Sequence, residues 1–366
     1  MVDTKPGYRA DIEGLRALAV ILVILYHFEV PGITGGFIGV DVFFVISGFV
    51  ITQLLERAFA KGSFSFRDFY ARRIRRLVPL FLLVSTVTFV VVSLFYIGDA
   101  YYIFAKSWLS SLIGISNLYY FSELTQYFAP ETRSLSLLHT WSLAVEEQFY
   151  LIWPLTLYIA YRFGKGRQGH WPFKITLLAT FALSVYMANH APAAAYYLLP
   201  ARLFEFMLGT GVALFANQLP KLNRPLAEAL AVCGLTMVIA TALLITCTDQ
   251  LSNFFKYGIG RLRPCHDLEI SDIMRLVKSY CGGKFGYFSA HAANSFAPAT
   301  FFALLFKGKV KFIGWIMILW AIIVAYSRIY IGVHFPLDVL TGAAIGAFFG
   351  WVFYKLSIFA FQKMGT

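Results

Sequence analysis

A group of polar residues in the last third of the chain has the types and spacing that phosphoryl transfer requires. Lysine and arginine neutralise the charge of a phosphate, and more strongly the charge that develops in the transition state. A serine hydroxyl can donate to a phosphate oxygen, and two histidines can divide the roles of nucleophile and general acid. A carboxylate four residues after a histidine can hold the second ring nitrogen and fix the tautomer. The residues are Lys256, Arg263, Ser289, His291, Arg328, His334 and Asp338.

These residues lie in three motifs: K-x6-RP, FSAH and SR-x5-H-x3-D. The segment 246–360 resembles the type-2 phosphatidic-acid phosphatase superfamily, in which the second motif reads PSGH. The resemblance implies that His334 forms a phosphohistidine, that His291 protonates the leaving group and that Asp338 orients His334. It also implies that no metal takes part and that four side chains hold the phosphate of a lipid substrate. Those four are Lys256, Arg263, Ser289 and Arg328.

The alternative is that these are interfacial residues, since arginine and histidine at the ends of membrane helices commonly extend toward water. Three separated motifs that converge at one depth favour the catalytic interpretation.

A second group of ionisable residues lies within the apolar runs of the first two thirds of the chain. Such residues are costly inside a membrane helix and indicate a functional site. A histidine with nearby carboxylates has the parts of a general base. The alternative is that the charges pair to hold helices together, Asp41 or Glu147 with Arg16 or Arg202. The group comprises Arg16, His27, Asp41, Glu146, Glu147, Arg202 and Glu205.

The runs that carry these residues are YRADIEGLRALAVILVILYHF, GGFIGVDVFFVISGFVIT, FYARRIRRLVP, HTWSLAVEEQFYLIWP and ARLFEFMLG. Together they resemble acyltransferase family 3, membrane enzymes that acylate bacterial surface glycans. The resemblance implies transfer from cytoplasmic acyl-CoA, as co-substrate without a bound cofactor, to a sugar hydroxyl outside. His27 matches the essential histidine of the R-x10-H motif that begins at Arg16.

Four arginines stand together in FYARRIRRLVP, at Arg72, Arg73, Arg75 and Arg76. Arginine binds phosphate with two parallel hydrogen bonds, so the cluster suits a phosphate-bearing acyl donor. It suits equally well an anchor on anionic lipid.

The composition predicts the elements that position these groups. Of 366 residues, 59% are hydrophobic and 14% are charged, and the mean hydropathy is +0.68. These values exclude a soluble globular enzyme, a disordered chain and a disulfide scaffold. We expect an all-α, polytopic integral membrane bundle of about 10 to 11 apolar helices. The net charge of +12 then belongs to cytoplasmic loops rather than to a nucleic-acid site.

Apolar runs of helical length are found at 15–31, 36–55, 77–98, 101–121, 140–161, 174–189, 199–216, 228–247, 289–306, 312–331 and 337–361. If both 77–98 and 101–121 crossed the membrane, the basic segment 162–167 would lie outside, against the positive-inside rule. We therefore expect 101–121 to be re-entrant or interfacial.

This topology predicts a multi-pass protein of the bacterial inner membrane with the phosphatase-like residues on the outer face. The expected partners are membrane lipids and a lipid-linked phosphate or glycan substrate. Cys265 and Cys281 can form a disulfide if their loop lies outside, and two free thiols are the equal alternative.

The two resemblances divide the chain into 1–245 and 246–366. The first part lacks the last helices of its family, and the second lacks the first helices of its own. They meet without a linker near 244–250, which suggests that two sequences have been joined there. Three hypotheses follow: both chemistries operate, only one survives, or the chain is a non-catalytic transporter or scaffold.

Overall fold

The computed structural model describes residues 9–28, 30, 33–124, 135–163, 170–215, 224–271, 281, 283–308 and 312–364. The regular structure of these residues is helical, which confirms the predicted all-α fold; one isolated bridge joins Leu262 to Phe285. The chain forms two compact units, Met1–Gly39 with Leu222–Thr366, and Val40–Lys221. The predicted division of the chain near residue 245 falls inside the helix Arg224–Ile259. It concerns the origin of two sequence segments rather than the way they pack, so it stays a prediction.

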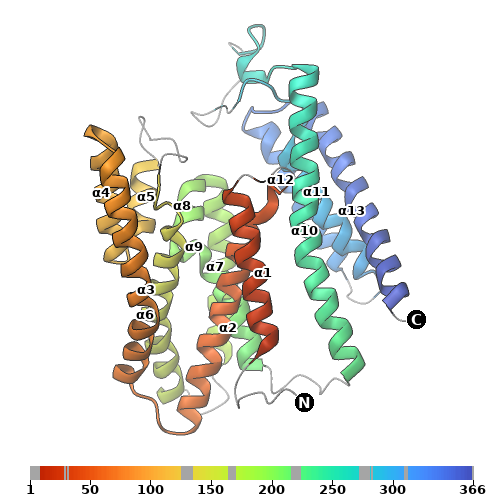
Figure 1. Cartoon of the computed structure of the whole chain (residues 1–366). Helices are drawn as coiled ribbons and strands as arrows, with labels where there is room; N and C mark the ends of the chain where they lie inside the picture. The colour runs from red at the N-terminus through yellow and green to blue at the C-terminus, as the bar shows by residue number, and fades with distance from the viewer. Residues whose placement is uncertain are drawn as a thin grey trace. The chain divides into compact units, whose positions relative to one another are not determined.

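The first unit contains the N-terminal helix and the C-terminal segment from Leu222 onward (Figure 1). Its elements are α1 (Ala10–His27), the 3-10 turn η1 (Gly35–Phe37), α10 (Arg224–Ile259), the 3-10 turn η4 (Pro264–His266), α11 (Ala290–Leu305), α12 (Ile313–Tyr330) and α13 (Pro336–Met364). α10 is longer than the apolar run 228–247 that predicts it, and its last turn carries Lys256.

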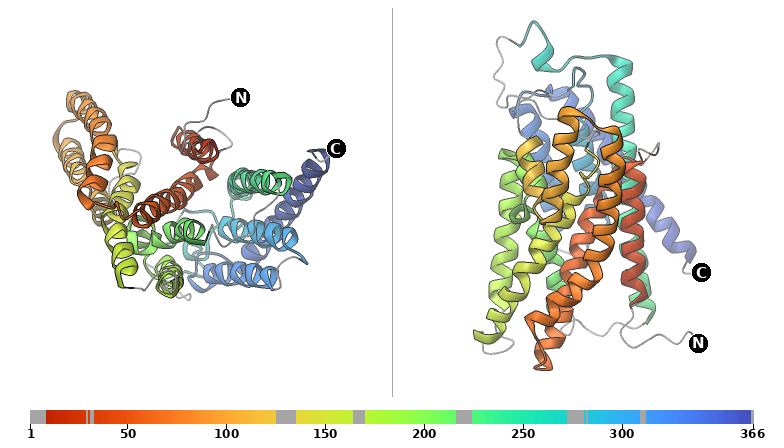
Figure 2. Two further views of the ribbon diagram at one scale, coloured as in Figure 1. Left: turned by 90° about the horizontal axis from the view of Figure 1, so that it is seen from below. Right: turned by 60° about the vertical axis from the view of Figure 1, so that its left-hand side comes forward.

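Helices α11 and α13 pack closely because one face of α13 has no side chains. The three glycines of that face meet backbone carbonyls of α11 in the same chain order, so the two helices run parallel. Close approach over small residues is a usual way for membrane helices to associate. From below, α11, α12 and α13 lie side by side (Figure 2). The contacts are Gly342 with Ser289, Gly346 with Ala293, and Gly350 with Ala297.

The second unit contains eight helices among its described residues: α2 (Ile38–Ala60), whose first two residues belong to the first unit, α3 (Phe66–Phe95), α4 (Gly98–Leu112), α5 (Ser116–Leu124), α6 (Thr140–Phe163), α7 (His170–His190), α8 (Pro192–Tyr197) and α9 (Leu199–Phe215). Aromatic rings fill the space between α2, α6 and α9. Phe206 stacks on Phe44 and Phe149, with centroids 4.6 and 4.3 Å apart. Stacked buried rings add to the stability that area burial provides.

Three helices of the described residues are long and apolar enough to cross a membrane, within Gly35–Ala60, Phe66–Phe95 and Pro336–Phe359. The run 101–121 forms two short helices, α4 and α5, with Gly114 between them at a φ of +70°. Neither reaches the roughly 20 residues that a bilayer core requires. The basic segment 162–167, on which the sequence argument depended, lies largely outside the described residues.

Candidate functional site

The phosphatase-like residues of the first unit occupy helix ends and the turns between them. Lys256 lies in the last turn of α10, and Arg263 precedes η4. Ser289 is the N-cap of α11, where its hydroxyl accepts from the Ala292 amide at 3.4 Å. The Ser289 amide donates to the Asp338 carbonyl at 3.0 Å and so joins the first turns of α11 and α13. The parallel packing of these helices thus places the second and third motifs together.

The charged members of the three motifs share one electrostatic environment. The imidazole of His291 interacts with Arg328, His334, Lys256 and Arg263. Those four residues come from α12, the turn before α13, α10 and the segment before η4. Arg328 also interacts with Arg263, and His334 with both Arg263 and Lys256. Several cations gathered around two histidines are suited to a bound anion.

Two polar atoms in this group are buried without a hydrogen-bond partner, Arg328 Nε and His334 Nδ1. Buried polar atoms in native proteins almost always have partners, so an unpaired one calls for an explanation. A phosphate oxygen would pair with the guanidinium nitrogen. His334 itself is 3% exposed, and burial, together with Arg263 and Lys256, lowers the pKa of its ring, while Asp338 partly opposes the effect.

Asp338 does not form the expected hydrogen bond with His334, because Nδ1 and Oδ2 are 3.7 Å apart. Oδ2 accepts from the Phe335 amide at 3.0 Å, and Oδ1 accepts from Arg261 Nη1 at 3.2 Å. Arg261 was not among the predicted residues, since it stands within the six unspecified positions of K-x6-RP. The carboxylate of Asp338 is buried and therefore requires a charged partner, which is the signal that could have identified Arg261.

The two predicted residues of α1 lie far apart along the helix. Eleven residues at a rise of roughly 1.5 Å each separate Arg16 from His27. Arg16 pairs with Glu13 at 3.3 Å, and both side chains are exposed. His27 Nδ1 lies 2.8 Å from the Val23 carbonyl. Because a carbonyl only accepts, a hydrogen bond here assigns the proton of the neutral ring to Nδ1 and leaves Nε2 as the acceptor.

In the second unit, Arg202 of α9 bridges two carboxylates. Its Nη1 lies 3.1 Å from Asp41 of α2 and 2.8 Å from Glu205. Its guanidinium also lies over the rings of Trp141 and Tyr196. Of the four pairings foreseen by the helix-holding interpretation, Asp41 with Arg202 is therefore present.

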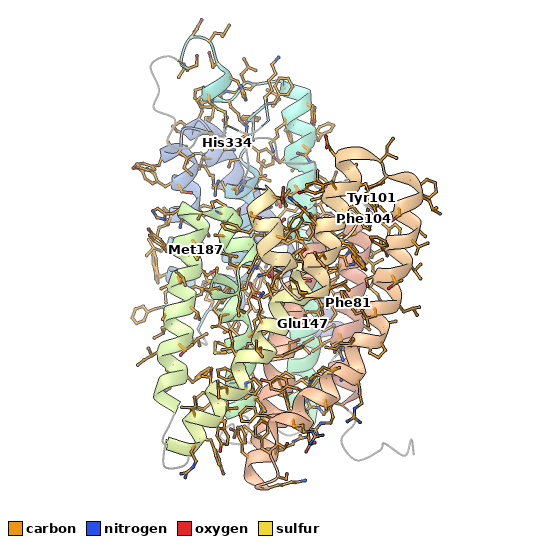
Figure 3. The ribbon with its side chains drawn as sticks, turned by 90° about the vertical axis from the view of Figure 1, so that its left-hand side faces the viewer. Phe81, Tyr101, Phe104, Glu147, Met187 and His334 are labelled. Carbon is orange, nitrogen blue, oxygen red and sulfur yellow. A yellow bond between two sulfur atoms is a disulfide. The ribbon has the colours of Figure 1, made fainter. Side chains whose placement is uncertain are left out.

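The two neighbouring glutamates of α6 have different surroundings. Glu146 accepts from the hydroxyls of Ser47 and Tyr150 at 2.8 and 3.2 Å. Glu147 lines a cavity of about 470 Å³ between α3, α6 and the break after α4. Phe81 lines the same cavity, and Figure 3 labels both residues. Such a volume is typical of ligand pockets, which are mostly apolar with a few polar groups.

The four arginines of the cluster on α3 also differ in their surroundings. Arg73 is half-buried, lines the cavity, and holds its guanidinium 5.4 Å from the ring centroid of Tyr150. Arg72, Arg75 and Arg76 are exposed. The sequence pattern could not distinguish these four residues, because the difference arises from the helical phase.

The loop after α10 is closed by a disulfide between Cys265 and Cys281. Arg263 is bonded to one end of this loop and to the segment after it, because its Nη1 donates to the Cys281 carbonyl and its Nε to the Phe285 carbonyl, both at 3.3 Å. Of the two alternatives predicted for Cys265 and Cys281, a disulfide or two free thiols, the structure contains the disulfide.

Comparison with known proteins gives two family matches. An acyltransferase-domain family model matches residues 9–262, and a PAP2-superfamily model matches residues 229–361. Both resemblances drawn from the sequence motifs are confirmed, and the two matches overlap along α10. No solved structure matches the chain.

The similar curated proteins include O-acetyltransferases. The putative peptidoglycan O-acetyltransferase YrhL of Bacillus subtilis is 36% identical over 63% of this chain and 39% of its own length. The peptidoglycan O-acetyltransferase OatA of Listeria monocytogenes is 32% identical over 69% of this chain and 41% of its own length. The O-acetyltransferase OatA of Staphylococcus aureus is 38% identical over 43% of this chain and 26% of its own length. The chain thus spans less than half the length of these relatives.

Proposed function

Since the chain belongs to the acyltransferase family whose model matches residues 9–262, we propose that it transfers an acyl group to a hydroxyl of a bacterial envelope glycan. The contact between His27 Nδ1 and the Val23 carbonyl is the observation that carries this proposal. With Nδ1 donating to the Val23 carbonyl, Nε2 is free to remove a proton from a sugar hydroxyl. The hydroxyl oxygen then attacks the acyl carbonyl, the bond between the acyl carbon and its carrier breaks, and the carrier leaves with the proton that Nε2 took up. The relatives named above as peptidoglycan O-acetyltransferases suggest peptidoglycan as the acceptor.

The proposed donor is acyl-CoA, and the cavity at Glu147 is its proposed acyl-chain site. Apolar side chains of α3 and α6 line the cavity, and Arg73 stands at its wall. The exposed Arg72, Arg75 and Arg76 continue along the same part of α3 and suit the phosphates of the donor.

The proposed location is the inner membrane, with the loop after α10 outside. The disulfide between Cys265 and Cys281 supports this orientation, since disulfides persist in oxidising compartments. A cysteine in place of Leu268, which is 89% exposed, should react with an impermeant maleimide in intact cells lacking the other free thiols. A cysteine in place of Lys307, at the far end of α11, should react only after permeabilisation. The reverse pattern would contradict the orientation.

Replacement of His27 tests the acyltransferase. His27→Ala should abolish acylation of the envelope glycan in a strain without other acyltransferases, while membrane insertion is retained. His190 is a matched control, because it ends α7 and contacts the Tyr186 carbonyl through Nδ1 at 2.9 Å. His190→Ala should leave acylation unchanged. Full acylation by the His27 variant would refute the role.

A second activity, hydrolysis of a lipid phosphate, is favoured by the unpaired atoms Arg328 Nε and His334 Nδ1. His334 Nε2 attacks phosphorus, and the bond to the leaving oxygen breaks as His291 gives that oxygen a proton. Water then attacks the phosphohistidine, His291 takes one of its protons, and phosphate is released. Lys256, Arg263 and Arg328 neutralise the charge that develops on the phosphoryl oxygens.

Vanadate tests this activity, because its trigonal-bipyramidal form resembles the transition state and should inhibit. The purified protein should hydrolyse a short-chain phosphatidic acid in the presence of EDTA. His334→Ala should abolish turnover, whereas His266→Ala, an exposed histidine of η4, should not. His291→Ala should matter least for substrates whose leaving group needs no proton. Folded protein without vanadate-sensitive turnover would refute the activity.

A further inference from the structure

The carboxylate of Asp338, which we expected to orient His334, is hydrogen-bonded by Arg261 instead. Asp338 is fully buried, and its two oxygens accept from the Phe335 amide and from Arg261 Nη1. His334 Nδ1 is 3.7 Å from Oδ2 and has no partner. A hydrogen bond between nitrogen and oxygen requires about 2.7–3.2 Å, so this pair is close to bonding without being bonded.

Two contacts besides the ion pair with Asp338 hold Arg261 in place. Its guanidinium carbon lies 4.5 Å from the ring centroid of Phe335. Its carbonyl accepts from the Gly286 amide at 2.9 Å, next to the bridge between Leu262 and Phe285. A guanidinium held by its backbone and by a stacked ring loses little further entropy when it bonds a carboxylate.

We propose that Arg261 is a positioning residue of the phosphoryl-transfer site, which fixes Asp338 beside His334 and balances its charge. This inference rests on the proposed phosphohydrolase function. With Oδ1 fixed by Arg261, a small movement brings Oδ2 within bonding distance of Nδ1 when the ring takes up positive character. Without Arg261 the buried carboxylate retains only the Phe335 amide, and its direction is no longer determined.

Arg261 also moderates the field that Asp338 exerts on His334. The other groups that act on His334 are Arg263 and Lys256, and His291 faces it from α11. We expect these groups to keep their positions when Arg261 is removed. The uncompensated carboxylate then stabilises the protonated ring, so the acid limb of the kcat profile should move to higher pH.

The experiment compares Arg261→Ala, Arg261→Lys and Lys284→Ala on a short-chain phosphatidic acid. Lys284 is an exposed cation in the same bridge region that stacks on Phe285, and it is the control for a general loss of charge. Arg261→Ala should lower kcat by about 10- to 100-fold, as misplacement of a reacting group by about 1 Å does, with KM nearly unchanged. Arg261→Lys should restore part of kcat, and Lys284→Ala should resemble the wild type.

Four results would overturn the proposal. A raised KM and weaker vanadate inhibition with unchanged kcat would show that Arg261 binds the phosphate directly. A lower kcat with an unmoved acid limb, no rescue by lysine and a lower melting temperature would show a structural role. Wild-type turnover that Arg261→Ala leaves intact would refute this inference alone. A folded wild-type chain without vanadate-sensitive turnover would refute the phosphohydrolase function, and this inference with it.

Discussion

Two arginines of this protein, Arg202 and Arg328, have opposite electrostatic surroundings. Arg202 has two carboxylates and two aromatic rings around it, so its charge is compensated within the protein. Arg328 has a buried Nε without a partner, and the residues that interact with it include another cation, Arg263. A compensated arginine supports packing, whereas a group of cations with unpaired donors is suited to an anionic ligand.

The pH dependence of phosphohydrolysis should report the environment of His334. Burial lowers the pKa of this ring, so the nucleophile stays unprotonated through the ordinary histidine pKa of about 6.5. We expect kcat/KM to be constant from neutral pH down to that value and to fall only below it. An acid limb at or above pH 6.5 would contradict the buried environment.

The same shift affects stability with a defined sign. Below about pH 6.5 the unfolded chain binds a proton that the folded chain does not, so acidification favours unfolding. The melting temperature should therefore fall as the pH drops below that value. His334→Ala should reduce this dependence, because the protonation difference at this residue is then absent.

At the scale of helices, hydropathy predicts the apolar core of each element but not its ends. α10 extends from Arg224 to Ile259, well beyond the apolar run 228–247, and its last turn carries Lys256 of the phosphate site. The break between α4 and α5 depends on the left-handed backbone at Gly114, which no apolar pattern reveals. The motifs likewise named the residues of the phosphate site but not Arg261, since a spacer position carries no signal until its partner is known.

The glycine face of α13 should be essential for assembling the phosphate site. A side chain at Gly346 would overlap the Ala293 carbonyl and force α11 and α13 apart. Gly346→Leu should cost about 1–3 kcal/mol or more and abolish phosphohydrolysis. Gly234 of α10 has nothing within 4 Å of an added Cβ, so Gly234→Leu is the control. Melting temperature and turnover measure both effects, and an active Gly346 variant would show that the close packing is dispensable.

The disulfide should act on substrate binding more than on chemistry. Arg263 donates to the Cys281 carbonyl, so loss of the disulfide frees one of its supports. Replacement of both Cys265 and Cys281 by serine should raise KM several-fold and change kcat little. A membrane-permeant reductant should reproduce this in the wild type and have no effect on the double variant. An unchanged KM in the reduced wild type would contradict the role.

For the whole molecule, the question is whether the two proposed chemistries depend on each other. The two family matches share residues 229–262, so α10 belongs to both. α1, which carries His27, belongs to the same compact unit as the phosphate site, whereas Arg202 and Glu147 belong to the other unit. The chain is therefore not two independent domains in series, and packing alone does not separate the activities.

Local contacts nevertheless predict that the two reactions can be separated. The contacts that the structure gives the His27 ring are within α1, to the Val23 carbonyl and the Tyr26 ring. The contacts of His334 and Asp338 involve the turn before α13, α11 and Arg261. Substitutions without shared partners act nearly independently, so each should leave the other activity within about twofold. His27→Ala should abolish only acyl transfer, and His334→Ala only phosphohydrolysis, when both are assayed on one membrane preparation. Loss of acyl transfer in the His334 variant, with normal insertion and melting temperature, would mean that phosphoryl chemistry is a step of the acylation itself.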